Sequence, residues 1–325
     1  MMDTPICDFV NAYADSDALR FHMPGHKGRP FLGAEPLDIT EIDGADVLYH
    51  ADGIIRRSEE NAAALFGTAR TLYAAEGSSL CIRAMLYLAM LHAKAHGKRP
   101  VIAAGRNAHK VFMTAAALLD LEIRWLFPAQ PKSVLSCEID ADTLEQTLSA
   151  DEPPTAVYIT SPDYLGNVAD VQALAAVCHR HGALLLVDNA HGAYLRFLPS
   201  PCHPMALGAD MCCDSAHKTL PVLTGGAYLH IARGAPTALG EAAETALALF
   251  ASTSPSYLIL QSLDAANRYL AGDYPARLAD YVRQVAALKE RLAAHGYPLL
   301  GTEPLKLTIA PKAYGYTGTA LARRL

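Results

Sequence analysis

Between about residue 55 and residue 235, short apolar runs alternate with longer stretches rich in alanine and leucine. The short runs are typical of buried strands, and the alanine- and leucine-rich stretches have a helix-forming composition. This alternation predicts an α/β domain with a largely parallel sheet, in which a helix connects successive strands. We expect strands at 71–75, 101–104, 156–160, 183–187 and 227–230, and helices at 79–95, 110–119 and 171–181.

Polar segments follow four of these apolar runs, at 76–79, 106–110, 161–164 and 188–191. In a parallel sheet the carboxyl ends of the strands share one edge, and ligands bind outside that edge. The sequence therefore predicts a single site to which all four segments contribute.

Asp188 directly follows the apolar run 183–187, and Lys218 comes 30 residues later, in the segment 214–221. A lysine amine can form a Schiff base with a cofactor aldehyde, and an aspartate at a strand end can keep a pyridine nitrogen protonated. The pair is typical of a pyridoxal phosphate site. Taken alone, it also fits a solvated loop lysine and an ordinary strand-end carboxylate, so the surrounding residues must decide.

A phosphate would find donors at two places near Lys218. Gly77, Ser78 and Ser79 follow a predicted strand and open a helix, where free backbone amides and hydroxyls favour an anion, although such a turn is also a common helix cap. Ser215 and His217 flank Lys218 and can add donors to the same phosphate, or they are structural residues of a turn.

Two histidines are candidates for contacts with the cofactor ring. His109 follows the predicted strand at 101–104, where a flat ring can stack on the pyridine face. His191, three residues beyond Asp188, can orient the cofactor or the substrate carboxylate, or relay protons near neutral pH. An aspartate and a histidine at this spacing, as in Asp188 and His191, are also compatible with a metal site. No third and fourth ligand has convincing spacing, so we expect no metal.

Composition excludes several classes of protein. The chain has 325 residues, which suits one large domain with a smaller appendage, and its formal net charge of −6 gives no basic footprint for nucleic acid. Seven scattered cysteines lack the spacing of a zinc site or a disulfide scaffold. We find no signal peptide and no apolar run of about 20 residues, so we expect a cytoplasmic protein without a membrane anchor.

The ends of the chain differ from its middle. We expect an N-terminal arm at 1–50 with a short helix and the loop 21–28, a cofactor-binding large domain at 51–293, and the start of a small domain at 294–325. The alanine- and leucine-rich stretch from 240 to about 293 indicates helix. A strand is expected at 305–309, followed by a helix that begins at 317.

Seven segments, in this order along the chain, give the sequence a close resemblance to the bacterial ornithine/lysine/arginine decarboxylases. They are 21–28 (FHMPGHKG), 76–80 (EGSSL), 106–110 (RNAHK), 160–166 (TSPDYLG), 188–193 (DNAHGA), 215–221 (SAHKTLP) and 252–257 (STSPSY). The resemblance covers essentially the whole chain and is most specific around Lys218 and Asp188. The residues do not reveal a role for the Pro24-Gly25-His26 loop.

The resemblance implies the fold of the type I pyridoxal phosphate enzymes, with a mostly parallel seven-stranded sheet and a C-terminal small domain. It makes Lys218 the Schiff-base lysine, Asp188 the partner of the pyridine nitrogen and His109 the stacking residue, with His191 beside the ring. The phosphate would be held by Gly77, Ser78, Ser79, Ser215 and His217. Thr253 or Ser254 would reach the phosphate of a neighbouring subunit, which implies a homodimer or a larger homo-oligomer.

The chain differs from family members at both ends. It resembles the short form, which lacks the N-terminal receiver-like domain of the long form. Members also continue into a complete small domain, so we expect this chain to stop, at 323–325, inside the opening helix of an incomplete one.

The resemblance implies decarboxylation of arginine, lysine or ornithine to carbon dioxide and a polyamine precursor. Lys218, Asp188 and His191 would be the catalytic residues. Two other hypotheses stay open: another type I enzyme such as an aminotransferase, lyase or aldolase, and a cofactor-binding fragment without turnover. The sequence identifies neither the amino acid nor the carboxylate that a cationic side chain requires.

Overall fold

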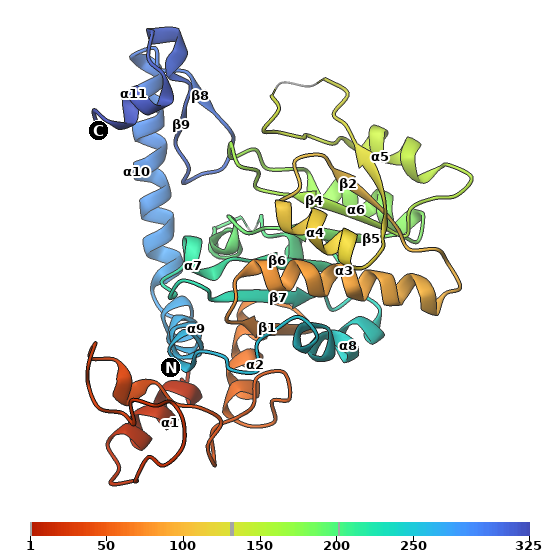
Figure 1. Cartoon of the computed structure of the whole chain (residues 1–325). Coiled ribbons are helices and arrows are strands. Elements are labelled where there is room, and N and C mark those ends of the chain that lie inside the picture. Colours follow the sequence, from red (N-terminus) through yellow and green to blue (C-terminus); the bar gives the residue numbers. More distant parts are fainter. Residues whose placement is uncertain (1, 131–132, 201) are drawn as a thin grey trace.

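The computed structural model describes residues 2–130, 133–200 and 202–325. Within these ranges, the centre of the molecule is a seven-stranded sheet with the strand order β1-β7-β6-β5-β4-β2-β3 (Figure 1). Strand β7 is antiparallel to both of its neighbours, and the other pairs are parallel. The strands are β1 (Arg70–Ala74), β2 (Val101–Gly105), β3 (Glu122–Leu126), β4 (Ala156–Thr160), β5 (Leu184–Asp188), β6 (Met211–Asp214) and β7 (Ala227–Ile231). The predicted α/β class and the mostly parallel seven-stranded sheet are confirmed.

Helices cover both faces of the sheet (Figure 1). Helices α3 (Ser78–Ala95), α4 (Lys110–Leu118) and α8 (Thr237–Ala248) lie on one face, and α5 (Ala141–Leu148) and α6 (Val171–Arg180) on the other. Side chains of β4 alternate between the two cores: Tyr158 packs on Phe112 of α4, with 4.5 Å between ring centroids, whereas Val157 and Ile159 join the core under α5 and α6.

The N-terminal segment packs against helices from both halves of the chain. Ile6 and Val10 are fully buried in the main core, and the Asp264 carboxylate accepts hydrogen bonds from the backbone N–H groups of Ile6 (3.0 Å) and Cys7 (2.9 Å). Asp264 lies on α9, so residues more than 250 positions apart stabilise one another. The elements involved are α1 (Pro5–Ala14), η1 (Glu35–Leu37), α2 (Ile54–Phe66) and α9 (Tyr257–Leu270).

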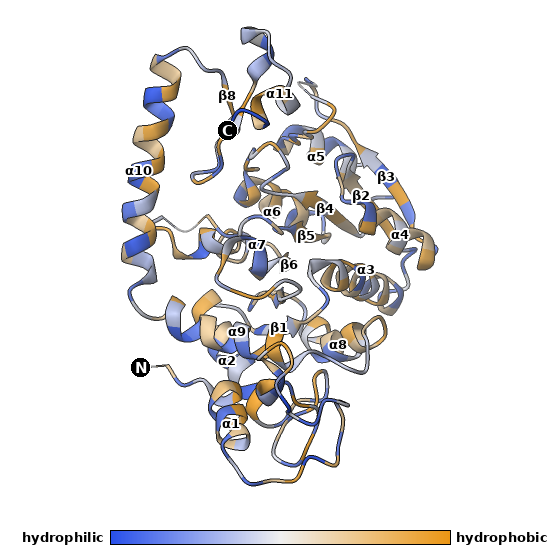
Figure 2. Ribbon diagram, turned by 60° about the vertical axis from the view of Figure 1, so that its left-hand side comes forward, coloured by the Kyte–Doolittle hydropathy of each residue, from blue (hydrophilic) through white to orange (hydrophobic). Residues whose placement is uncertain are grey.

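A long helix, α10 (Tyr274–Ala294), leads from α9 to the C-terminal part of the chain (Figure 1). There lie the hairpin of β8 (Leu299–Leu300) and β9 (Thr308–Ile309), then η4 (Pro311–Tyr314) and α11 (Gly318–Ala322). Helix α10 mixes hydrophilic and hydrophobic residues along its length (Figure 2). No helix in the described parts of the chain combines the length and the apolar character needed to cross a membrane.

The structure refines or corrects three sequence-based predictions of secondary structure. The stretch from 240 to 293 is mostly helical, as predicted, but it is divided into three helices by breaks at 249–256 and 271–273. The strand expected at 305–309 is only Thr308–Ile309. Strands β3 and β6 were not predicted: β3 carries charged residues at an exposed edge of the sheet, and β6 has only 4 residues.

Candidate functional site

A pocket of about 300 Å³ lies at the carboxyl ends of β4 and β5. All four polar segments predicted to meet at one edge contribute to it. Its predicted residues are Gly77, Ser78, Ser79, His109, Asp188, His191, Ser215, His217 and Lys218. Ile82, Asn107, Leu135, Thr160, Tyr164 and Ala190 also line it and were not singled out from the sequence. Thr253 is exposed and is not among the lining residues of this chain's pocket.

Asp188 is the last residue of β5 and is only 3% exposed. Its Oδ2 accepts a hydrogen bond from the Tyr158 hydroxyl (3.0 Å), and its Oδ1 accepts one from the Ala190 N–H (3.2 Å). Burial nevertheless raises the pKa of Asp188 above its usual value. Sequence reasoning missed Tyr158. The register pairs Tyr158 with Leu186, which places its side chain on the same sheet face as Asp188, and no local sequence pattern shows this pairing.

Lys218 lies on the short helix α7 (Ala216–Thr219), which follows β6, and its side chain is exposed. Its Nζ is 3.5 Å from Nε2 of His191. Burial, with further contributions from the positive charges of Lys218 and Lys306, lowers the pKa of His191 to about 4. His191 is therefore neutral near pH 7 and can accept a proton or a hydrogen bond beside the lysine amine.

The first turn of α3 faces the pocket without a side-chain cap. Gly77 occupies the N-cap position with φ of +74°, and its N–H donates to the Gly225 carbonyl (2.6 Å), which fixes the turn. The buried Ser215 hydroxyl donates to the hydroxyl of Ser78 (2.8 Å). Backbone N–H groups at a helix start and two joined hydroxyls make this end of the pocket suited to an anion.

The two remaining histidines of the pocket have their ring orientations fixed by the backbone. His217 Nδ1 donates to the Gly226 carbonyl at 2.9 Å, because a carbonyl can only accept. His109 caps α4 instead, with its Nδ1 accepting a hydrogen bond from the Val111 N–H (3.2 Å). Each ring thus turns its Nε2 edge away from its backbone partner.

A buried hydrogen-bond network is centred on Asp214, the last residue of β6, which directly precedes the pocket residue Ser215. Oδ2 of Asp214 accepts hydrogen bonds from Nε2 of His203 (2.9 Å) and of His230 (3.0 Å), and its Oδ1 accepts one from the Asn189 amide (2.6 Å). Burial alone would raise the pKa of Asp214, but the two histidines hold it below its usual range.

The residues of this network have the side chains of a metal site. However, the Met205 N–H donates to Nδ1 of His203 (3.3 Å), which places the His203 proton on Nε2. That nitrogen then donates to Asp214 and offers no lone pair to a metal. We interpret the network as structural. It fixes the position of Asn189, which follows Asp188, and of Ser215, which precedes α7.

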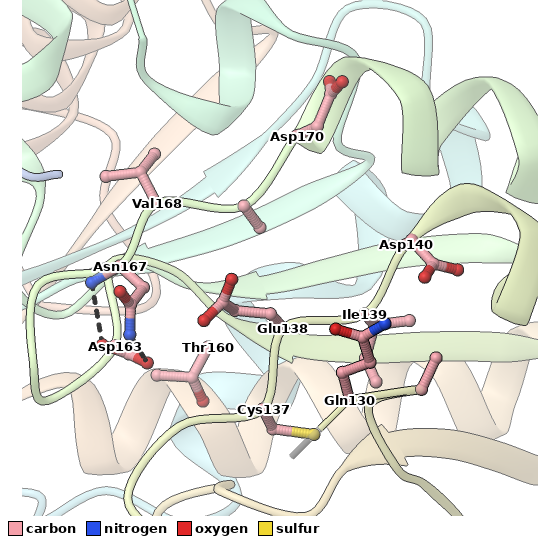
Figure 3. Close-up of a pocket in the computed structure, with 12 residues that line it drawn as sticks. Gln130, Cys137, Glu138, Ile139, Asp140, Thr160, Asp163, Asn167, Val168 and Asp170 are labelled. Carbon is pink, nitrogen blue, oxygen red and sulfur yellow. Dashed lines mark hydrogen bonds between the residues drawn. The ribbon is translucent and has the colours of Figure 1, made fainter. Parts of the chain in front are cut away.

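A second pocket, of about 400 Å³, adjoins the first at Thr160 and is lined by several acidic residues (Figure 3). Asp163 accepts hydrogen bonds from the N–H (2.9 Å) and the side-chain amide (2.8 Å) of Asn167 and thereby closes its own loop. Asp140 caps α5 and Asp170 caps α6. These three carboxylates stabilise their own segments, so their presence does not indicate a ligand.

The sequence model of the Orn/Lys/Arg decarboxylase major domain matches residues 4–303. The arginine decarboxylase of Halalkalibacterium halodurans is 32% identical over 339 aligned positions, which cover 97% of this chain and 67% of that protein. The arginine decarboxylase of Bacillus cereus is 28% identical and is covered to 72% of its length. The chain thus spans about two thirds of these curated relatives.

Solved structures agree on the fold. Lysine decarboxylase A from Pseudomonas aeruginosa superimposes with a TM-score of 0.76 at 19% identity, over 89% of this chain and 43% of that one. Serine palmitoyltransferase from Sphingomonas wittichii gives a TM-score of 0.61 at 18% identity, over 94% of this chain and 67% of that one. The predicted fold of the type I pyridoxal phosphate enzymes is confirmed, and the chain spans less than half of the lysine decarboxylase.

Proposed function

Because the chain belongs to the Orn/Lys/Arg decarboxylase family, we propose that it uses pyridoxal phosphate to decarboxylate a basic amino acid. The observation that carries the proposal is the meeting of Asp188 and Lys218 in one pocket, although 30 residues separate them in the sequence. A buried carboxylate, a lysine amine and an uncapped helix start then surround the same space.

The residues present fit this cofactor. Asp188 is a buried carboxylate whose pKa is raised by burial, and a pyridine N–H is a cationic donor that would stabilise its ionised form. The first turn of α3, with Ser78 and Ser215, offers donors to a phosphate. His109, at the start of α4, is available to stack on the ring.

When bound, the cofactor supplies an electron sink for the bond that breaks at the α-carbon. Lys218 would hold the cofactor through its amine until the substrate amine takes that place. Asp188 holds the proton on the ring nitrogen. His191, which is neutral and 3.5 Å from the Lys218 amine, can accept a proton at Nε2, and either residue can protonate the α-carbon once it carries that proton.

The substrate is arginine, lysine or ornithine, and the product is the corresponding amine. Among the described lining residues Asp188 is the one carboxylate, and it serves the cofactor, so the group that binds the distal cation lies elsewhere. We further propose a cytoplasmic homodimer or larger homo-oligomer, in which Thr253 reaches the phosphate in the neighbouring subunit.

Covalent trapping tests the cofactor assignment. The protein is incubated with pyridoxal phosphate, reduced with borohydride, digested and analysed by mass spectrometry. We expect the pyridoxyl group on the peptide that contains Lys218, no label at that peptide in Lys218→Ala, and unchanged labelling in Lys110→Ala, which removes another lysine beside the site. A label distributed over many lysines, or retained in Lys218→Ala, contradicts the proposal.

A further inference from the structure

The segment after β8 binds to the loop that follows β4. The N–H groups of Thr302 and Glu303 both donate to the Gly166 carbonyl, each at 2.8 Å. The Thr308 hydroxyl donates to the Leu165 carbonyl (2.9 Å). Because the same loop carries Tyr164 into the pocket, the position of this C-terminal segment is tied to the site.

Within this segment, the side chain of Lys306 has a defined direction. The backbone N–H of Lys306 donates to the carboxylate of Glu303, and Glu303 is only 4% exposed. The backbone carbonyl of Glu303 in turn accepts a hydrogen bond from Lys289 Nζ (2.6 Å). The Lys306 stem passes so close to Gly166 that a Cβ there would lie 3.3 Å from Lys306 Cδ. The stem therefore follows the loop toward Tyr164.

The Lys306 ammonium lies over the ring of Tyr164, which lines the cofactor pocket, although Lys306 itself is not among the lining residues. Its Nζ lies 5.2 Å from the ring centroid of Tyr164, which stands edge-on to His191 with 6.4 Å between centroids. His191 in turn lies beside Lys218. In the part of the chain that the structure describes, Lys306 makes no ion pair within 4.0 Å, although the Glu303 carboxylate is nearby.

We propose that Lys306 binds the α-carboxylate of the amino acid, an inference that rests on the proposed function. The α-carboxylate is the one anionic group of a basic amino acid, and a single carbon separates it from the amine that replaces Lys218. A bound substrate can therefore turn its carboxylate to the side of His191 and Tyr164, where the ammonium stands. The same charge repels the distal cation and gives the substrate one orientation.

This role separates substrate from product. The amine product has lost the carboxylate and keeps only positive charges, so Lys306 attracts the substrate and repels the product. Release of the product is then favoured by the same residue that favours binding of the substrate. Lys306 lies outside the residues matched by the family sequence model, 4–303.

The test measures binding, and the absorbance is read by rapid mixing so that it is recorded before turnover. The absorbance of the cofactor-loaded protein is titrated with arginine and with agmatine, which is arginine without its carboxylate, and lysine and cadaverine form a second pair. The variants are Lys306→Met, Lys306→Arg and, as a matched control far from the pocket, Lys98→Met.

We expect the wild type and Lys98→Met to bind the amino acid more tightly than the amine. Lys306→Met should weaken amino-acid binding by roughly ten- to a hundredfold, as for loss of a charge-assisted hydrogen bond, and leave the amine unchanged or slightly tighter. Lys306→Arg should restore most of the amino-acid affinity.

Equal weakening of both ligands in Lys306→Met, no weakening, or no preference for the amino acid in the wild type overturns the proposal. The outcome is separate from that of the proposed function. If no carbon dioxide is released but Lys306→Met still loses affinity only for the carboxylate-bearing ligand, decarboxylation is wrong and the carboxylate site stands.

Discussion

At the scale of single residues, the site depends on groups whose ionisation is set by burial. Asp188 is a nearly buried carboxylate at a strand end, supported by the Tyr158 hydroxyl, and burial raises its pKa. Such a carboxylate gains most from a cationic partner, because solvent does not stabilise its charge. This is the physical reason for assigning the ring nitrogen of the cofactor to Asp188 rather than to an exposed acid.

Asp188→Asn should therefore keep the cofactor on Lys218 but lower kcat by about 10²–10³-fold, the usual loss on removing one electrostatic group from a transition state. The amide is nearly isosteric but carries no charge to hold the ring proton. Borohydride trapping and steady-state kinetics measure the two effects separately. An Asn variant with wild-type kcat would show that Asp188 is not the partner of the ring.

His191 gives a prediction of pH dependence. Its pKa of about 4 in the folded protein lies below the ordinary 6.5, so the unfolded chain binds more protons between these values. The stability that neutral His191 provides is present above pH 6.5 and declines as the pH falls toward 4. We expect the ring C–H resonance, assigned with His191→Gln, to titrate near pH 4 in the cofactor-free protein and at higher pH in Lys306→Met. A midpoint at 6.5 in both proteins would contradict this.

At the scale of elements, the sequence patterns predicted the helices and strands that have a clear local pattern of apolar residues. They missed the strands that depend on pairing with neighbours. Helices α3, α4 and α6 and strands β2, β4 and β5 are long enough, or apolar enough, to be recognised alone. Strand β6 has 4 residues and is stabilised by pairing with β5 and β7, which no local pattern shows. The site was predictable because Asp188 ends an apolar run that is recognisable as a strand and because the segments around Asp188 and Lys218 carry the family resemblance. Tyr158 and Lys306 act through tertiary contacts and were missed.

The turn that begins α3 provides a test at this scale. Gly225 has φ of +102°, and a Cβ there would lie 2.7 Å from the Ala75 carbonyl oxygen. Gly225→Ala should lower the free energy of unfolding by about 3 kcal/mol, since it adds a backbone clash to the strain at positive φ. It should also weaken cofactor binding about tenfold by displacing the Gly77 turn.

Gly97→Ala is the matched control, because Gly97 also has positive φ (+66°) but nothing within 4 Å of an added Cβ. Gly97→Ala should lower the free energy of unfolding by about 1 kcal/mol and leave the Kd of the cofactor unchanged. Urea unfolding and absorbance titration measure both quantities. Equal effects of the two substitutions would show that the Gly225 turn does not position the helix start.

At the scale of the whole molecule, residues 19–32 expose several large apolar side chains. Phe21, Leu32 and Phe31 are 87%, 88% and 92% exposed, and Leu19 and Met23 are more than 70% exposed. Clusters of exposed apolar residues commonly mark protein interfaces. Together with the exposed Thr253, which lies outside this chain's own pocket, they support the proposed homo-oligomer.

We therefore expect sedimentation velocity to show a dimer or larger assembly at micromolar concentration. The double substitution Phe21→Ser, Phe31→Ser should raise the dissociation constant at least about 100-fold, because each buried phenylalanine contributes about 1.5–3 kcal/mol. Leu118→Ser changes a residue that is 67% exposed at the end of α4 and should have no effect. A monomeric wild type would contradict the proposed assembly.

The release of carbon dioxide from carboxyl-labelled arginine, lysine and ornithine would test the proposed activity of the whole chain most directly. The wild-type protein with pyridoxal phosphate should release labelled carbon dioxide from at least one of the three, with one amine formed for each carbon dioxide, and Lys218→Ala should release none. Formation of an oxo acid without carbon dioxide, or release that persists in Lys218→Ala, would show that this site does not decarboxylate basic amino acids.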